Sequence, residues 1–270
     1  MFSNANQKID LNHIFRFTLA MIMENQLIVG LFLVLIGIVL FVVGLYFFKK
    51  RQLIADTPTS KIRSIAMGLV EICGQVIPIK ERLFRSPFTD KECVYYQFTV
   101  EEYRSSGKNS QWVTVKKGEQ RGLFYLKDES GKVLIDPTGA QIDARKDFEY
   151  QSGLGKDPPE QVIRFLAANN LSHDGFFGLN KTMRYRETII VPDEPLYIMG
   201  TAGENSMKTE GTEDHVDSIM IQKGKYEKHY YISDKSEKQI LSNLALSTYG
   251  VWGVGVAFII GGAILFFGLV

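Results

Sequence analysis

Two long apolar stretches stand at opposite ends of the chain. Residues 27–48 and 249–270 contain no Asp, Glu, Lys or Arg, and each stretch is 22 residues long. At about 1.5 Å of rise per residue, such a helix extends roughly 33 Å and matches a bilayer core of about 30 Å. We therefore predict transmembrane helices over 27–48 and 249–270, an N-terminal tail over 1–26, and a soluble domain over 49–248.

Between the apolar stretches, short apolar runs alternate with polar positions and end at turn residues, a pattern typical of β-strands. Strands are predicted over 65–77, 93–103, 112–115, 124–126, 133–135, 183–191, 196–202, 215–222 and 229–233. One segment differs, because Asp157 and Pro158 precede apolar residues at helical spacing, as a capping residue and a first-turn proline do. A further helix over 235–246 leads into the second apolar stretch.

Short strands separated by turns favour a β-rich fold over a parallel layer of alternating strands and helices. The fold class that we predict is an α+β membrane protein. Its β-rich domain, a sandwich or partly closed barrel with one inserted helix, lies between the two transmembrane helices.

The charges are nearly balanced, with 31 Lys and Arg against 30 Asp and Glu and a net charge of +1. This balance leaves no basic surplus for nucleic acid, so no nucleic-acid partner is expected. Lys8 and Arg16 precede the first apolar stretch, whereas Lys49–Arg51, Lys61 and Arg63 follow it. Because the more basic flank of a membrane helix usually stays in the cytoplasm, we predict an integral two-pass protein with a cytoplasmic domain and both termini outside.

Small residues recur along one side of each predicted membrane helix. The rows are Gly30, Gly37 and Gly44 in the first helix, and Gly253, Ala257 and Gly261 in the second, where Gly255 and Gly262 also repeat at seven residues. Small residues let membrane helices approach closely, so the rows predict packing of the two helices as a hairpin or between protomers. The alternative is that glycine is simply frequent in membrane helices.

Few residues of the domain have a spacing typical of catalysis or metal binding. The chain has two Cys and four His, enough for one four-ligand zinc site at most. Glu213–Asp217 offers a carboxylate–histidine pair for metal or proton transfer, but an acidic turn before a strand explains it as well. Gly153–Lys156 is either a fragment of a phosphate-binding loop or an ordinary turn. We predict no catalytic residue, no metal site and no cofactor.

One loop is a candidate for recognition, because exposed loops on a rigid sheet often carry binding function. It consists of Asp136, Pro137, Thr138 and Gly139, which equally fit a structural type I or II turn. Arg186 and Glu187 are predicted to be solvated charges or charges at the edge of a strand ladder, and Cys73 and Cys93 to be buried and unpaired. The aromatic side chains predicted to pack in the core and across strands are Tyr95, Tyr96, Tyr103 and Trp112.

A series of motifs follows in a fixed order between the two apolar stretches. They are Ser86-Pro87-Phe88-Thr89, Cys93-Val94-Tyr95-Tyr96, Val100-Glu101-Glu102-Tyr103, Gly131–Ala140, Arg184-Tyr185-Arg186-Glu187 and Leu196–Ala202. This series resembles the GIDE (BAM) domain family over most of residues 27–270. The resemblance implies a membrane-tethered domain, which in a mitochondrial E3 ubiquitin ligase of the family precedes a zinc-binding RING. In that protein the domain faces a non-cytosolic side, so the resemblance implies the side opposite to the one that the basic flank predicts. A RING binds two zinc ions through four ligands each, whereas this chain has only six Cys and His in all. We therefore expect a member of archaeal or bacterial type without a RING.

From these observations we predict a non-catalytic, membrane-anchored binding or scaffold module that recruits or organises protein partners. One alternative, implied by the resemblance, is an E3 ubiquitin-ligase-like protein that acts through a separate RING protein or conjugating enzyme. Another is a lipid- or stress-sensing module that rests on head groups through Lys49–Arg51 and Lys61–Arg63. The expected partners are the lipid bilayer, an unidentified protein and, if helices pair between protomers, a second copy in a homo-oligomer.

Overall fold

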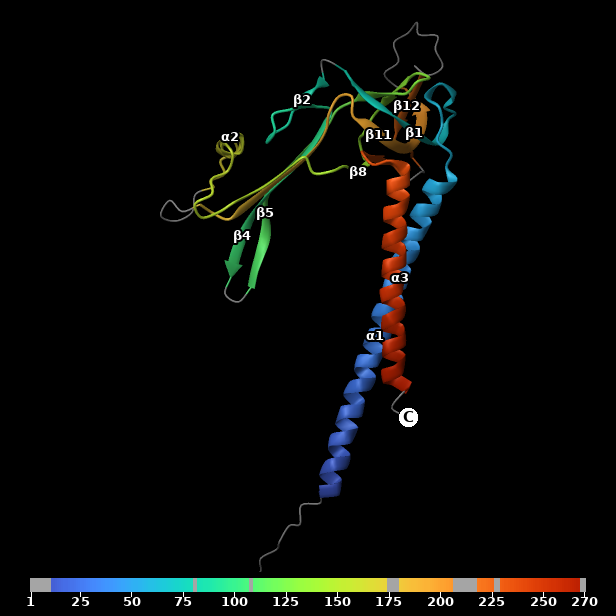
Figure 1. The fold of residues 1–270 in the computed structure, drawn as a ribbon, viewed down its shortest axis with the longest axis vertical. Helices are drawn as coiled ribbons and strands as arrows, with labels where there is room; N and C mark the ends of the chain where they lie inside the picture. Colours follow the sequence, from blue (N-terminus) through green and yellow to red (C-terminus); the bar gives the residue numbers. More distant parts are fainter. Residues whose placement is uncertain are drawn as a thin grey trace, which may run out of the picture. The chain divides into compact units, whose positions relative to one another are not determined.

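The computed structural model describes residues 11–79, 82–106, 109–173, 180–205, 218–225 and 229–267. The chain divides into two compact units. One joins Met1–Asp56 with Lys238–Val270, and the other is Thr57–Glu237. The first unit is a pair of long helices and the second is rich in β-strands (Figure 1).

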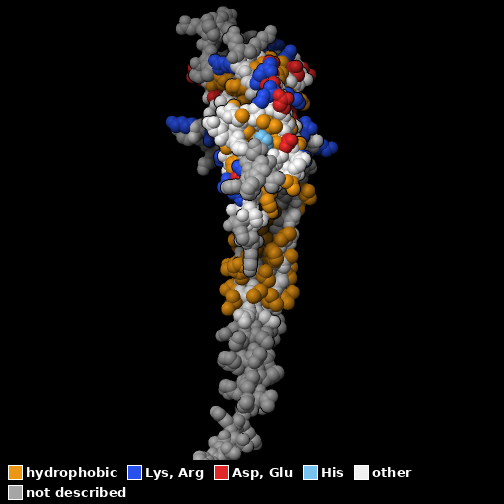
Figure 2. Space-filling view, turned by 90° about the vertical axis from the view of Figure 1, so that its left-hand side faces the viewer, with side chains coloured by type: hydrophobic (Ala, Val, Ile, Leu, Met, Phe, Trp, Pro, Cys, Tyr) orange, Lys and Arg blue, Asp and Glu red, His pale blue; other side chains and the backbone are white. Residues whose placement is uncertain are grey.

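The helix pair consists of α1 (Leu11–Asp56) and α3 (Glu237–Phe267). Over Asn25–Asp56 and over the whole of α3, the helices are long and apolar enough to cross a membrane. Hydrophobic side chains gather along the helix pair, whereas most charged side chains in this view lie over the β-rich unit (Figure 2). Helix α1 already begins inside the segment predicted as a tail, and the helix predicted over 235–246 is the first part of α3.

A small barrel forms one part of the β-rich unit. Its strands are β1 (Gly68–Pro78), β6 (Phe124–Lys127), β7 (Lys132–Ile135), β12 (Ile219–Gln222) and β11 (Pro195–Glu204). The pairings follow that order, and β11 returns to β1, so the ring of five strands closes. Strands β7 and β12 pair over only two residues, in parallel, which makes this the weakest seam. From β11 the sheet continues through β13 (Tyr231–Ser233) to β8 (Gln141–Asp143).

Alternating apolar residues fill the barrel, as the period of a strand requires. In β1, Val70, Ile72 and Val76 belong to the buried core, while Cys73 on the other face is exposed. At Gly74 the neighbouring strand approaches so closely that a Cβ atom would lie 2.5 Å from the carbonyl oxygen of Lys127. Only glycine fits this approach.

The other part of the β-rich unit is an antiparallel sheet covered on one face by a helix. The strands, in spatial order, are β5 (Asn109–Arg121), β4 (Tyr95–Ser106), β10 (Met183–Ile190) and β9 (Phe148–Ser152). Helix α2 (Glu160–Ala168) lies on one side of this sheet (Figure 1). Val162 and Leu166 of α2 are buried with Phe98 and Tyr185 of the sheet. Short elements complete the unit: η1 (Ile62–Ser64), β2 (Phe84–Arg85) and β3 (Glu92–Cys93).

The prediction of an α+β fold with a β-rich domain and an inserted helix is confirmed, and part of the domain is a five-stranded barrel. The predicted capping role of Asp157 is wrong. Helix α2 begins at Glu160, after Pro159 at the capping position. Because a residue before proline disfavours helical backbone, the Pro158-Pro159 pair keeps the chain extended up to that point.

Candidate functional site

The helix pair is held together where three glycines of α1 face α3. A Cβ atom at Gly30 would lie 2.9 Å from the carbonyl oxygen of Gly262, and one at Gly37 would lie 2.6 Å from that of Gly255. At Gly44 the added atom would meet the indole of Trp252 at 2.3 Å. Each contact is closer than a side chain allows, so the absence of Cβ atoms sets the distance between the helices.

The row predicted for the second helix does not lie in this contact. No atom outside the helix lies within 4 Å of a Cβ built at Gly253 or Gly261, and Ala257 is exposed. The residues that face α1 are Gly255 and Gly262, which are buried. A shift of two residues turns a side chain by about 200° around a helix, which puts the predicted row on another face.

Aromatic rings pack between α1 and α3 in the parts of the two helices that are nearest in sequence to the β-rich unit. The indole Nε1 of Trp252 donates a hydrogen bond of 3.1 Å to the carbonyl oxygen of Phe41. The same ring stacks on Phe41, with 5.6 Å between ring centres, and lies at the same distance from Phe48. Tyr249 contacts it edge-on at 6.3 Å. This cluster gives the pair of helices one defined register.

The candidate recognition turn is a rigid, partly exposed turn of the barrel. The backbone N–H of Thr138 donates to Asp136 Oδ1 over 3.0 Å, and that of Ala140 donates to the carbonyl of Pro137 over 3.1 Å. Gly139 has a φ of +77°, which other residues rarely adopt. Thr138 and Gly139 are exposed. The geometry fits the structural turn, and its role in recognition stays a prediction.

Two side chains, half-buried Arg121 and buried Tyr230, hold this turn from behind. Arg121 donates from Nη1 to the carbonyl oxygens of Pro137 and Ala140, at 2.6 and 2.9 Å. The hydroxyl of Tyr230 donates to the carbonyl of Asp136 over 2.6 Å. Three backbone carbonyls of the turn therefore accept hydrogen bonds from side chains in distant parts of the sequence. These bonds fix the backbone conformation of the turn.

Glu187 is buried, with only 1% of its surface exposed, on a strand that lies between β4 and β9, so the prediction of a solvated or ladder-edge charge is wrong. Its Oε1 accepts a hydrogen bond of 2.7 Å from the N–H of Phe88. Its Oε2 accepts from the N–H and the hydroxyl of Thr89, at 3.0 and 2.7 Å. These bonds hold Phe88 against Phe98 and Phe165, whose ring centres lie 5.6 and 5.2 Å away. Glu187 thus fastens a loop over the aromatic core between the sheet and α2.

The opposite face of the same sheet is polar. Arg184 donates from Nε to Glu101 Oε2 over 2.8 Å, and Arg186 donates to the same oxygen. Burial opposes ionisation of Glu101, but the hydrogen bonds and charges of the two arginines outweigh it and lower the pKa. The Arg184 guanidinium also lies 4.4 Å from the ring centre of Trp112. Trp112 packs across the hairpin on Tyr103, with 5.2 Å between the rings.

Of the four aromatic residues predicted to pack, Tyr103 and Trp112 form this cross-strand pair, and Tyr95 is buried in the barrel core. Tyr96 lies on the face covered by α2, against Phe98. The prediction of packing is therefore confirmed, although the residues do not form a single group.

A second buried carboxylate lies on the outside of β1. Glu71 is fully buried and accepts hydrogen bonds of 2.8 Å from the Thr59 hydroxyl and 2.7 Å from the Tyr197 hydroxyl. Desolvation raises the pKa of Glu71 in spite of both bonds. Desolvation and the neighbouring charges of Glu71 and Glu237 raise the pKa of the Cys73 thiol to about 11. Both cysteines are unpaired, as predicted. The predicted burial is confirmed for Cys93 and wrong for Cys73, which is exposed.

The remaining candidates show no reactive arrangement in the part of the chain that the structure describes. Gly153 and Lys156 exchange backbone hydrogen bonds of 3.1 and 2.9 Å, which is the ordinary turn. Glu213–Asp217 lies outside the described residues. Among the described side chains, no group of three or more His, Cys, Asp and Glu could hold a metal ion.

Comparison with known proteins gives one match. The GIDE family, described as E3 ubiquitin ligase, matches residues 95–266, which extend from β4 to the end of α3 and make up more than half of the chain. No curated protein matches, and neither does any solved structure.

Proposed function

The chain belongs to the GIDE family of E3 ubiquitin ligases, and on that premise we propose that it is a membrane-anchored module that recruits or organises protein partners. One observation carries the proposal. The unit Thr57–Glu237 continues at each end into a helix that is long and apolar enough to cross a membrane. With both ends anchored, the domain would have restricted tilt and a raised effective concentration toward other membrane proteins, without any new contact.

The proposed role of these 270 residues is non-catalytic. They contain two Cys and four His, whereas a RING needs two zinc sites of four ligands each. A RING that works with this domain would therefore lie outside these residues. An E3-like role then consists of presenting a partner to ubiquitin transfer, with the chemistry supplied elsewhere.

The rigid turn at Asp136–Gly139 supplies a surface suited to this role. Its backbone is fixed by Arg121 and Tyr230, so the exposed Thr138 is presented at little cost in conformational entropy. Binding residues are often found on such loops, held by a rigid sheet.

A photo-cross-linking residue in place of Thr138 tests the recruitment directly. In native membranes containing the full chain, we expect defined cross-linked proteins from position 138 and none from the same substitution at Gln111, which is exposed on the β4–β5 hairpin. If no protein is captured from either position, a second copy of the chain included, recruitment through this turn is wrong.

Ubiquitin transfer separates the E3-like alternative from a plain scaffold. The full chain is mixed with ubiquitin, activating enzyme and conjugating enzymes, with and without a separate RING protein. We expect no ubiquitin conjugates without the RING protein. Conjugates formed by the chain alone would contradict the non-catalytic proposal.

A further inference from the structure

A shallow polar pocket lies on the face of the four-stranded sheet opposite α2. It has a volume of about 160 Å³ and is lined by Gln97, Phe98, Thr99, Lys146, Arg186 and Thr188. Ligands of drug size need roughly 300–1,000 Å³, so this pocket suits a much smaller chemical group.

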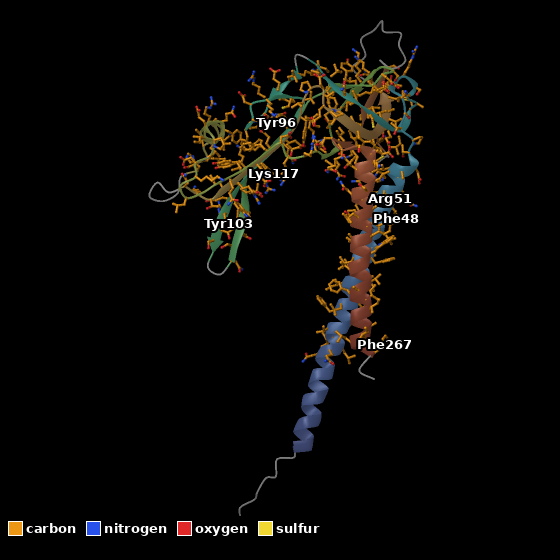
Figure 3. All side chains as sticks on the ribbon, in the orientation of Figure 1. Phe48, Arg51, Tyr96, Tyr103, Lys117 and Phe267 are labelled. Atoms are coloured by element: carbon orange, nitrogen blue, oxygen red, sulfur yellow. The ribbon has the colours of Figure 1, made fainter. Side chains whose placement is uncertain are left out.

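The strand register places the polar side chains of this pocket in two adjacent rows. Directly opposed residues share one face of an antiparallel sheet. One row runs from Lys117 through Thr99 to Arg186, and the next joins Gln97 to Thr188. Lys117 lies on the four-stranded sheet, nearer its middle than Tyr103 of the outer hairpin (Figure 3).

The side chains in these rows have hydrogen-bond donors that are not used. Within the described residues, the side chains of Gln97, Thr99 and Thr188 make no hydrogen bond, and Lys117 has no ion pair. The Nε of Arg186 is buried and has no hydrogen-bond partner, although Glu149 Oε1 lies 4.0 Å away. A buried donor without an acceptor is costly, so this arrangement favours a ligand that supplies acceptors.

The local charge has the sign that such a ligand needs. Glu101 is shared by two arginines, so one guanidinium of the pair is left without its own carboxylate. Glu149 lies 3.2 Å from Lys146 and is the nearest other acid to Arg186. Glu119 faces the same side but already pairs with Arg121 at 2.6 Å. With Lys117 added, the face has more positive than negative charge around the pocket.

We propose that this pocket binds a phosphate-type oxyanion, from free phosphate or from a phospholipid head group. The hydroxyls of Thr99 and Thr188 and the amide of Gln97 donate to its oxygens, while Arg186, Lys146 and Lys117 supply charge. Hydrogen bonds from cationic donors to an oxyanion are among the strongest in proteins. The site is independent of the recognition turn and of any role in ubiquitin transfer.

Phosphate binding is tested on the full chain in nanodiscs of phosphatidylcholine. Thermal unfolding is followed while inorganic phosphate replaces chloride at constant ionic strength. A ligand that binds only the folded state stabilises it by RT ln(1 + [L]/Kd), so the rise of the midpoint with phosphate concentration gives an apparent Kd. We expect phosphate to raise the midpoint of the unmodified chain above that in chloride.

The double variant Thr99→Val/Thr188→Val removes two donors and keeps β-branched side chains on the strands. We expect it to bind phosphate roughly tenfold or more weakly. The matched control is Thr114→Val, which changes an exposed threonine on the same sheet face outside the pocket and should leave the Kd unchanged. The proposal is overturned if phosphate stabilises the unmodified chain no more than chloride, or if the control weakens binding as much as the double variant.

The source of the oxyanion is separated by repeating the titration in nanodiscs that contain phosphatidylglycerol. If a head group occupies the pocket, added phosphate will raise the midpoint less than it does in phosphatidylcholine. If free phosphate is the ligand, the shift will be the same in both. Either result supports the oxyanion site and identifies its occupant.

Discussion

The indole nitrogen of Trp252 donates a hydrogen bond to the carbonyl oxygen of Phe41, which joins two helices whose residues are 211 positions apart in the chain. The ring reaches this position because residue 44 has no side chain. A Cβ atom at Gly44 would lie 2.3 Å from the indole. The glycine row of α1 therefore does more than allow close approach, since it also creates the space for a specific polar contact between the helices.

Substituting Gly44 with Ala should disrupt this contact. We expect the helix pair to lose about 1–3 kcal/mol, which is typical of overpacking a tight contact. The readout is Trp252 fluorescence in a Trp112→Phe background, because the chain has only two tryptophans. Gly253→Ala is the control, since a Cβ there meets nothing within 4 Å and should change neither emission nor stability. Equal effects from both substitutions would contradict the observed packing.

Glu187 should be essential for the loop that carries Phe88. In Glu187→Gln one oxygen is replaced by an amide group that cannot accept from the backbone, so a buried N–H loses its partner. We expect a loss of roughly 2 kcal/mol or more in the free energy of unfolding, measured by denaturant titration. Glu92→Gln, at an exposed carboxylate near the same loop, should cost less than about 1 kcal/mol. A Glu187→Gln protein as stable as the control would show that the loop is held by its apolar contacts alone.

Glu71 should make the fold less stable as the pH rises. Its pKa is raised in the folded protein, so the fold favours the protonated carboxyl. That stabilisation is complete below the pKa of the unfolded chain and is lost as the pH rises through the raised folded value. Glu71→Gln keeps an acceptor and a donor for Thr59 and Tyr197 but cannot ionise. The midpoint of thermal unfolding should therefore fall less steeply between pH 4 and 7 in the variant than in the unmodified chain. Identical slopes would refute this role of Glu71.

Cys73 should react slowly although it is exposed. Its thiol pKa is raised to about 11, so little thiolate is present at neutral pH. We expect the rate of alkylation by iodoacetamide, followed by mass spectrometry, to increase about tenfold per pH unit through pH 9. A rate that levels off near pH 9 would mean an ordinary pKa. Cys93 provides an internal control, because it is buried and should react only after unfolding.

The two long helices show what a repeat in the sequence can and cannot predict. Spacings of four and seven residues both place small side chains on one face of a helix. Gly30, Gly37 and Gly44 were the only such row in α1, and the structure places them against α3. In α3 two rows compete, and the spacing does not indicate whether Gly253 or Gly255 faces the neighbouring helix. That choice depends on packing between segments that are distant in the sequence.

The β-rich unit shows the same limit. The strands over Met183–Ile190 and Pro195–Glu204 follow from apolar and β-branched residues, and their predicted ranges match within a few residues. The burial of Glu187 could not be read from its neighbours, because its hydrogen-bond donor Phe88 lies 99 residues earlier. Strand β5 was predicted only over 112–115, since its charged second half, as far as Arg121, lacks an apolar alternation.

The arrangement predicted from the basic flank of α1 is that both helices cross the membrane and hold the domain between them on the cytoplasmic side. It is tested by adding protease to sealed, right-side-out vesicles that contain the chain with a different epitope tag at each end. We expect both tags to be removed and residues 49–248 to survive until detergent is added. Digestion of the domain would contradict the cytoplasmic placement, and survival of just one tag would contradict the two-span arrangement.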